Sequence, residues 1–309
     1  MPDTSNTYHK LLVETDQNHQ VRAPLYRQIE SQLREHLKQP VCLLAFFTSF
    51  NWPVAIGDRD VDMIEEVLRN TPMKGRKLAL MISSPGGDGM AAERIVNVCR
   101  NYSPGGDFLA VVPKMAKSAA TMICFGAAKI LMSNTSELGP VDPQIAIRND
   151  QGKVTEFQAA HELIQAYQEL ISKANTTRGR VEPYLQQLAR FDARDIRRMK
   201  SAQQLSEDIS VKCLKAGCLG KLSEAAIRRK IRPFIDPKHT IYHGRPIYAK
   251  LAQECGLNVQ VLPHDGPLWE SIWSLYVRLD YVVSQQPIGK VVESETIEYM
   301  ARVNPGAQA

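Results

Sequence analysis

The sequence has no apolar stretch long enough to cross a lipid bilayer. Its longest apolar run begins at Val41 and continues to Gly57, and Thr48, Ser49, Asn51 and Pro53 interrupt it. A membrane-spanning helix needs about 20 consecutive apolar residues, so we expect no insertion into a membrane. Residues 1–20 are polar and lack the apolar stretch of a secretory signal, which argues against export.

Cysteine pairs and excess charge are also lacking. The six cysteines are scattered through the chain, at positions 42, 99, 124, 213, 218 and 255. Four of them sit inside apolar patterns, which is typical of buried thiols in a reducing compartment rather than of a disulfide framework. Lys plus Arg is 38 and Asp plus Glu is 33, so the net charge is only +5, which argues against a dedicated nucleic-acid-binding protein. We therefore expect a cytoplasmic protein.

What is present is an ordinary globular composition with an alternating pattern over residues 41–132. The chain has 309 residues, of which 44% are hydrophobic and 23% are charged. Strands are predicted at 41–50, 77–83, 108–113 and 129–132, and helices at 58–70, 90–102 and 117–127. This alternation predicts an α/β fold with right-handed βαβ crossovers and a mainly parallel sheet. The continuously apolar run at 41–50 suits a strand covered on both faces.

The pattern changes on either side of this region. Residues 1–23 read as a polar arm, and a helix is predicted from Pro24 to Gln39. After Ile145, helices are predicted at 157–175 and 181–214. The segment 240–281 combines a short helix (249–255), a strand (258–262) and an amphipathic helix whose stripe of Trp269, Trp273 and Tyr276 indicates a core or subunit contact. We therefore expect three regions: 1–40, a core over 41–150, and a mainly helical region over 151–309.

A glycine-rich turn follows the predicted strand 77–83. It reads Ser84-Pro85-Gly86-Gly87-Asp88-Gly89, and glycine permits positive φ angles and a close approach of the main chain to a ligand. Just before a helix N-terminus, the amides of such a turn converge and can bind an anion. By itself the motif is equally typical of a plain strand-to-helix turn.

Ser118 stands at the start of the next small-residue helix, within Lys117-Ser118-Ala119-Ala120-Thr121. Its simplest role is a helix N-cap. A second role is an acyl-transfer nucleophile, with the amide of Ala119 and an amide of the Gly86-Gly87 turn forming an oxyanion hole. Because the carboxyl ends of parallel strands meet at one edge of a sheet, we expect these turns to lie together.

Longer motifs then point to a known family. The segments LALMISSPGGDG (78–89) and VVPKMAKSAATMICFGAAKILMSNTSELGPVDPQI (111–145) resemble the Clp protease/crotonase fold, and most of all the serine dehydrogenase proteinase family, a relative of the signal peptide peptidases. The resemblance extends weakly through residues 243–247 and 251–257. It implies a serine peptidase with Ser118 as nucleophile and Gly86 or Gly87 as an oxyanion donor. It also implies peptide or protein substrates, no cofactor, and a homo-oligomer, since relatives form rings or stacked trimers.

The general base is not fixed by these motifs. In Clp proteases a histidine follows the serine by one strand, but here residues 139–144 contain none. Related signal peptide peptidases use a lysine, and a buried lysine can titrate low enough to act as a base. The candidates are His161, Lys173, Lys153 and Lys117. His161 follows Ser118 at a spacing similar to that of the lysine in short membrane-associated relatives, although it also fits a packing role. Asp142 could orient a base or cap a turn.

Other functions stay open at this stage. A crotonase-like enzyme acting on an acyl-CoA thioester would also use paired amides, and a catalytically silent scaffold would need no base. His239 and His243 are four residues apart, but Pro237 and Gly244 flank them, so we expect a turn and no metal site. Basic clusters, such as Arg194, Arg197, Arg198 and Lys200, are interpreted as solvated helix faces.

Overall fold

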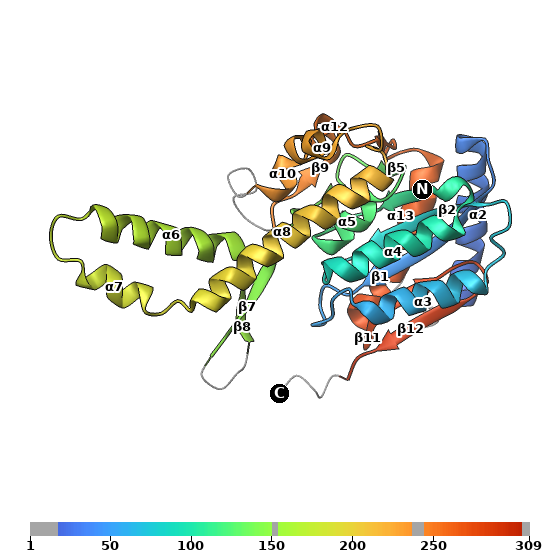
Figure 1. Ribbon diagram of the computed structural model, residues 1–309. Coiled ribbons are helices and arrows are strands. Elements are labelled where there is room, and N and C mark those ends of the chain that lie inside the picture. The colour runs from blue at the N-terminus through green and yellow to red at the C-terminus, as the bar shows by residue number, and fades with distance from the viewer. Residues whose placement is uncertain (1–17, 150–153, 237–243, 305–309) are drawn as a thin grey trace.

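A seven-stranded sheet forms the centre of the computed structural model, which describes residues 18–149, 154–236 and 244–304 (Figure 1). The strand order is β10-β5-β3-β2-β1-β11-β12. From β10 (Val259–Val261) to β1 (Val41–Thr48) all neighbours are parallel, through β5 (Lys129–Met132), β3 (Leu109–Val112) and β2 (Lys77–Ser83). The parallel α/β core predicted from the alternating pattern is thereby confirmed.

Helices cover both faces of this sheet. On one face lie α3 (Asp58–Arg69), α4 (Gly89–Tyr102), α5 (Ala119–Phe125) and the second half of α8 (Ala193–Ala216). On the other lie α2 (His19–Leu37) and α13 (Pro267–Gln285). All eight residues of β1 are buried, as its unbroken apolar run predicts. Helix α2 begins at His19 rather than at Pro24, because the Asn18 side chain caps it by accepting from the Val21 N–H at 3.3 Å.

The end of the chain completes the sheet with a hairpin that the sequence pattern did not reveal. Strand β11 (Ile288–Glu293) pairs antiparallel with β1, and β12 (Glu298–Arg302) pairs with β11. A buried ion-pair cluster ties this hairpin to α2: Arg22 Nε lies 2.9 Å from Glu293 Oε1, and Arg22 Nη2 lies 2.9 Å from Glu298 Oε2. Burial raises the pKa of Glu293, and the Arg22 guanidinium opposes that rise.

A small second sheet stands beside the carboxyl ends of the central strands. It consists of β4 (Met115–Ala116), β6 (Glu137–Leu138) and β9 (Ile247–Tyr248), in that order with one antiparallel edge. Around it lie α9 (Glu224–Lys230), α10 (Arg232–Ile235) and α12 (Ala249–Glu254), whereas η2 (Pro104–Gly106) packs against α4 at the other end of the central strands. Strand β4 ends two residues before Ser118, and β6 ends just before Gly139, so this sheet helps to fix where both segments meet α5.

The remaining helices form an arm that projects from the body (Figure 1). It contains α6 (Ala160–Thr176), α7 (Glu182–Leu188) and the first half of α8, which share a small core around Ile164, Ile196 and Met199. At its base, β7 (Gln144–Arg148) and β8 (Val154–Ala159) form a hairpin. The predicted helix at 157–175 therefore begins later, at Ala160, and the one predicted at 181–214 is two helices. Within the described residues, no helix combines the length and apolar character that a membrane span needs.

Candidate functional site

Ser118 occupies a strained position between β4 and α5. Its backbone has φ 50° and ψ −120°, and its side chain makes no N-cap hydrogen bond. A non-glycine residue held in such a region costs about 1–3 kcal/mol and persists only where its surroundings impose it. Here the Lys117 N–H donates to the Ser84 carbonyl at 3.0 Å, and the Met122 N–H donates to the Ser118 carbonyl at 3.2 Å. Ser118 is therefore the N-cap residue of α5 by position, but its half-buried hydroxyl does not cap the helix.

The diglycine turn, Gly86–Gly87, lies directly against Ser118. A Cβ added at Gly86 would stand 2.6 Å from Ser118 Cβ and 3.1 Å from the Ala119 nitrogen. Gly86 has φ +106° and Gly87 has φ +151°, which side-chain-bearing residues rarely adopt. The turn after β2 and the helix start after β3 thus meet at the carboxyl ends of neighbouring parallel strands, as the sequence predicts.

The orientation of each amide in this turn follows from its partners. The Gly86 N–H donates to Ser84 Oγ at 3.1 Å, so it is already occupied. The Gly86 carbonyl accepts from the Ile56 N–H at 2.8 Å. Since a trans peptide holds C=O and N–H in opposite directions, the Gly87 N–H points away from Ile56. Among the residues that the structure describes, neither the Gly87 N–H nor the Ala119 N–H has an acceptor.

The loop between β1 and α3 packs against the diglycine turn through Ile56. The Ile56 N–H and carbonyl bracket the diglycine turn, since the Asp88 N–H donates to the Ile56 carbonyl at 2.9 Å. A Cβ on Gly87 would come within 2.3 Å of the Ile56 carbonyl oxygen. The contact therefore requires glycine, and Ile56 is a residue of the site that the sequence motifs did not indicate.

Asp142 and His161 form a buried pair. His161 Nδ1 lies 3.4 Å from Asp142 Oδ2, and both side chains are under a tenth exposed. Asp142 lies in the turn after β6, His161 in the first turn of α6, and the Ala160 N–H donates to the Pro143 carbonyl at 2.9 Å. From the sequence, His161 is a candidate base and Asp142 could orient a base, but no sequence pattern predicts that these two residues pair.

Thr121 connects this turn to the helix that Ser118 begins. Its Oγ1 donates to the Ala116 carbonyl at 2.7 Å and accepts the Gly139 N–H at 3.0 Å. Thr121 lies one turn along α5 from Ser118, so the segment 139–143 runs past the same end of the helix. This contact places Gly139, three residues before Asp142, beside the first turn of α5.

The lysine candidates lie elsewhere. Lys117 Nζ forms an ion pair with Glu137 Oε1 at 2.9 Å. Lys173 is exposed in the last turn of α6, at the end of the arm that projects from the body (Figure 1). The Lys117 ammonium group is thus engaged by Glu137, and Lys173 lies on an exposed helix end. Lys153 lies outside the described residues.

The histidine pair predicted to form a turn, His239 and His243, also lies outside the described residues. Within the described ranges, no three His, Cys, Asp or Glu side chains are grouped so that they could hold a metal ion.

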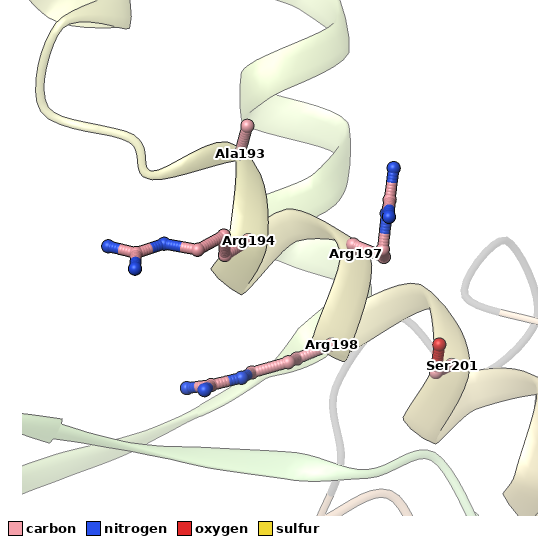
Figure 2. Close-up of a pocket in the computed structure, with 5 residues that line it drawn as sticks. All are labelled: Ala193, Arg194, Arg197, Arg198 and Ser201. Carbon is pink, nitrogen blue, oxygen red and sulfur yellow. The ribbon is translucent and has the colours of Figure 1, made fainter.

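Two hollows are lined by residues to which the sequence pointed, Asp142 in one and the arginine cluster of α8 in the other. One, of about 210 Å³, is lined by Asp142 and Pro143 together with Ser206 and Glu207 of α8, and so adjoins the buried pair. The other, of about 570 Å³, lies on the arm and is lined by Arg194, Arg197, Arg198 and neighbouring residues of α8. Figure 2 shows Arg197 pointing away from Arg194 and Arg198, whose guanidinium groups face the other side of the helix. These arginines do not converge on one point, as expected for a solvated helix face.

Comparisons with known proteins found relatives of part of the chain. Two uncharacterized proteins of Methanocaldococcus jannaschii are similar to the chain: one is 36% identical over 83 residues and the other 31% identical over 86 residues. These matches cover 26% and 28% of this chain, and the chain spans 28% of the length of each relative.

Among solved structures, a mutant of the 1510-N membrane-bound stomatin-specific protease matches with 14% identity and a TM-score of 0.30, covering 44% of this chain and 66% of that one. The model of the family described as ClpP-like SDH-type serine proteinase matches residues 46–157. This segment contains the diglycine turn, Ser118 and Asp142. Over residues 46–157, the resemblance to the serine dehydrogenase proteinase family is therefore confirmed.

Proposed function

We propose that this protein is a serine peptidase in which Ser118 attacks the substrate carbonyl and forms an acyl-enzyme. The observation that carries the proposal is the strained Ser118 backbone pressed against the diglycine turn. The same arrangement of a serine on a sharp strand-to-helix turn exposes the nucleophile in unrelated hydrolases. The family of residues 46–157 supports peptide-bond hydrolysis as the reaction.

The N–H groups of Gly87 and Ala119 form the oxyanion hole in this proposal. Both lack an acceptor among the described residues, and one belongs to the first turn of α5. Fixed backbone donors aimed at a developing oxyanion are each worth about 10²–10³ in rate. Gly86 contributes differently: its missing side chain lets the turn approach Ser118, while its own N–H stays bonded to Ser84.

The proposal assigns the role of general base to His161 and the role of orienting it to Asp142, because the two side chains are buried together with Nδ1 3.4 Å from Oδ2. With Nδ1 facing Asp142, the other ring nitrogen, Nε2, is the atom that accepts the Ser118 hydroxyl proton. The attack forms the Oγ–carbon bond, and Nε2 then gives the proton to the leaving amine. A water molecule repeats the sequence in reverse and frees Ser118. Lys173 of the same chain has no part in this mechanism.

The cytoplasmic location and the homo-oligomer are also proposals. The six cysteines are unpaired in the structure, and five of them are buried, which suits a reducing compartment. The arm supports self-association, because it exposes 63% of Phe157 and 54% of Leu185. We expect Phe157→Ser combined with Leu185→Ser to lower the mass measured by sedimentation. An unchanged mass would remove the arm as the contact.

The test of the peptidase proposal is labelling of the full-length protein with a fluorophosphonate probe, read by mass spectrometry. We expect Ser118→Ala to abolish labelling at an unchanged thermal midpoint, whereas Ser172→Ala, at an exposed serine of α6, labels normally. His161→Gln and Asp142→Asn should slow labelling by about 10²-fold or more, and Lys173→Met should not. Labelling that persists in Ser118→Ala would remove Ser118 as the nucleophile, and normal rates in His161→Gln would remove the base.

A further inference from the structure

We propose that Lys290, in the C-terminal strand β11, is a positioning residue for the oxyanion hole, which it holds in place through Asp60 and the β1–α3 loop. The inference rests on the proposed peptidase function for its catalytic consequence. The positioning itself is a property of the backbone and can be measured without any activity.

The first step is a buried ion pair. Lys290 Nζ lies 2.8 Å from Asp60 Oδ1 and 2.7 Å from Asp60 Oδ2, so the ammonium group contacts both carboxylate oxygens. The Asp60 side chain is fully buried, and the Lys290 side chain is 15% exposed. Removing one partner of such a pair leaves a buried charge uncompensated. The pair therefore constrains strongly where the first turn of α3 can lie relative to β11.

The second step leads from Asp60 into the loop. Asp60 Oδ2 also accepts the Gly57 N–H at 2.8 Å, and the Asp60 N–H donates to the Gly57 carbonyl at 3.0 Å. The bond from the Gly57 N–H to the Asp60 carboxylate is the acidic half of a capping box, and the backbone bond replaces the half that Gly57 cannot supply; together they fix the chain as it enters the helix. Gly57 is the residue next to Ile56, so the same carboxylate that holds Lys290 sets the position of the Ile56 peptide groups.

The third step leads from Ile56 to the diglycine turn. Its N–H donates to the Gly86 carbonyl and its carbonyl accepts from the Asp88 N–H. Because the Gly86 carbonyl and the Gly87 N–H belong to one planar peptide group, the Ile56 contact fixes the direction of the Gly87 N–H. A rotation of that peptide would change the direction of the Gly87 N–H, which the proposed function assigns to the oxyanion hole.

Other contacts of the C-terminal region hold the same loop. The Ser49 N–H donates to the Gly289 carbonyl at 2.8 Å, and the Trp52 indole Nε1 donates to the Gln286 carbonyl at 3.0 Å. A Cβ on Gly289 would stand 2.9 Å from a methyl group of Val54. The loop is thus packed between the C-terminal strand β11 and the diglycine turn. Lys290 of β11 adds an ion pair to Asp60, where the loop enters α3.

The experiment compares Lys290→Met with Lys77→Met in the full chain. Lys77 is a matched control, because its side chain is also 15% exposed and pairs with Asp107 at 2.7 Å at the opposite end of the sheet. Amide hydrogen exchange by NMR reports on the Ile56 and Asp88 N–H groups, and fluorophosphonate labelling reports on Ser118. Peptide hydrolysis, where present, separates kcat from KM.

We expect Lys290→Met to accelerate exchange at Ile56 and Asp88 at least tenfold, with β2 amides unchanged. Labelling of Ser118 should slow at least tenfold, and kcat should fall with KM within twofold. Lys290→Arg should recover most of both effects, and Lys77→Met should show neither. If Lys290→Met does not fold, the neutral double variant Asp60→Asn with Lys290→Met, which leaves no buried charge, takes its place.

Unchanged exchange at Ile56 and Asp88 would overturn the inference, and so would an equal change in Lys77→Met. Failure of the proposed function gives a different result. In that case the native protein does not label at Ser118, while exchange at Ile56 and Asp88 still responds to Lys290→Met.

Discussion

Gly86→Ala is the substitution whose effect the structure specifies most closely. The new Cβ would stand 2.6 Å from Ser118 Cβ and 2.7 Å from the Lys117 carbonyl oxygen, whereas ordinary contacts are 3.4–4 Å. Ser118 must therefore move by about 1 Å, a displacement that can cost about 10²-fold in an active site. The backbone at φ +106° adds about 1–3 kcal/mol of strain. We expect fluorophosphonate labelling of Ser118 to slow by about 10²-fold.

Gly75→Ala separates the two contributions. Gly75 also has a positive φ of +74°, but a Cβ there meets nothing within 4 Å, so only backbone strain is added. Both variants should lower the thermal midpoint by several degrees, at about 2–4 °C per kcal/mol, and only Gly86→Ala should slow labelling. Normal labelling in Gly86→Ala would refute the contact between the turn and Ser118. Equal slowing in Gly75→Ala would show that lost stability, not displacement, is the cause.

Three further predictions follow from the same structure. Ser118→Gly should be more stable than Ser118→Ala by about 1–2 kcal/mol and so unfold at a higher temperature, because glycine adopts φ 50° without strain; equal thermal midpoints would contradict the strain. Arg22→Met should destabilise the fold by about 3–5 kcal/mol in urea unfolding by stranding Glu293, and adding Glu293→Leu should recover most of it. Burial raises the pKa of Cys42 and Cys99 to about 12, so both thiols should resist iodoacetamide at pH 8. Because the pKa of each thiol is higher in the folded than in the unfolded protein, the stability that these buried thiols contribute is fully present below about pH 8.5 and is lost as the pH rises toward 12. Rapid alkylation of the native protein would disprove this burial.

The sequence predicts the parallel half of the sheet well because burial leaves a strong local signal there. The strand 77–83 and the strand 129–132 are continuous apolar runs and match β2 and β5 residue for residue. The meeting of the diglycine turn with Ser118 follows from the same logic, since parallel strands bring their carboxyl ends together. Local pattern and topology were enough for these features.

The features that the sequence does not predict are either exposed to solvent or formed between residues that are distant in the sequence. The hairpin of β7 and β8 stands out from the body and leaves Phe157 63% exposed, so no alternating burial marks it. Strand β11 pairs with β1, which is far from it in the sequence, and β12 is added to the sheet through β11. The contacts of Lys290 with Asp60 and of His161 with Asp142 also join residues that are separated in the sequence, and no rule based on residue spacing could have predicted them.

The antiparallel pairing of β11 with β1 has a consequence for synthesis on the ribosome. Strand β1 is made well before β11, and this edge of β1 finds its partner only when residues 288–293 emerge. Until then the nascent protein carries an apolar strand with unpaired backbone groups, a template for association with other chains. We therefore expect prematurely terminated chains that end before Ile288 to aggregate or to be retained by chaperones, even though they contain every residue of the diglycine turn and its serine.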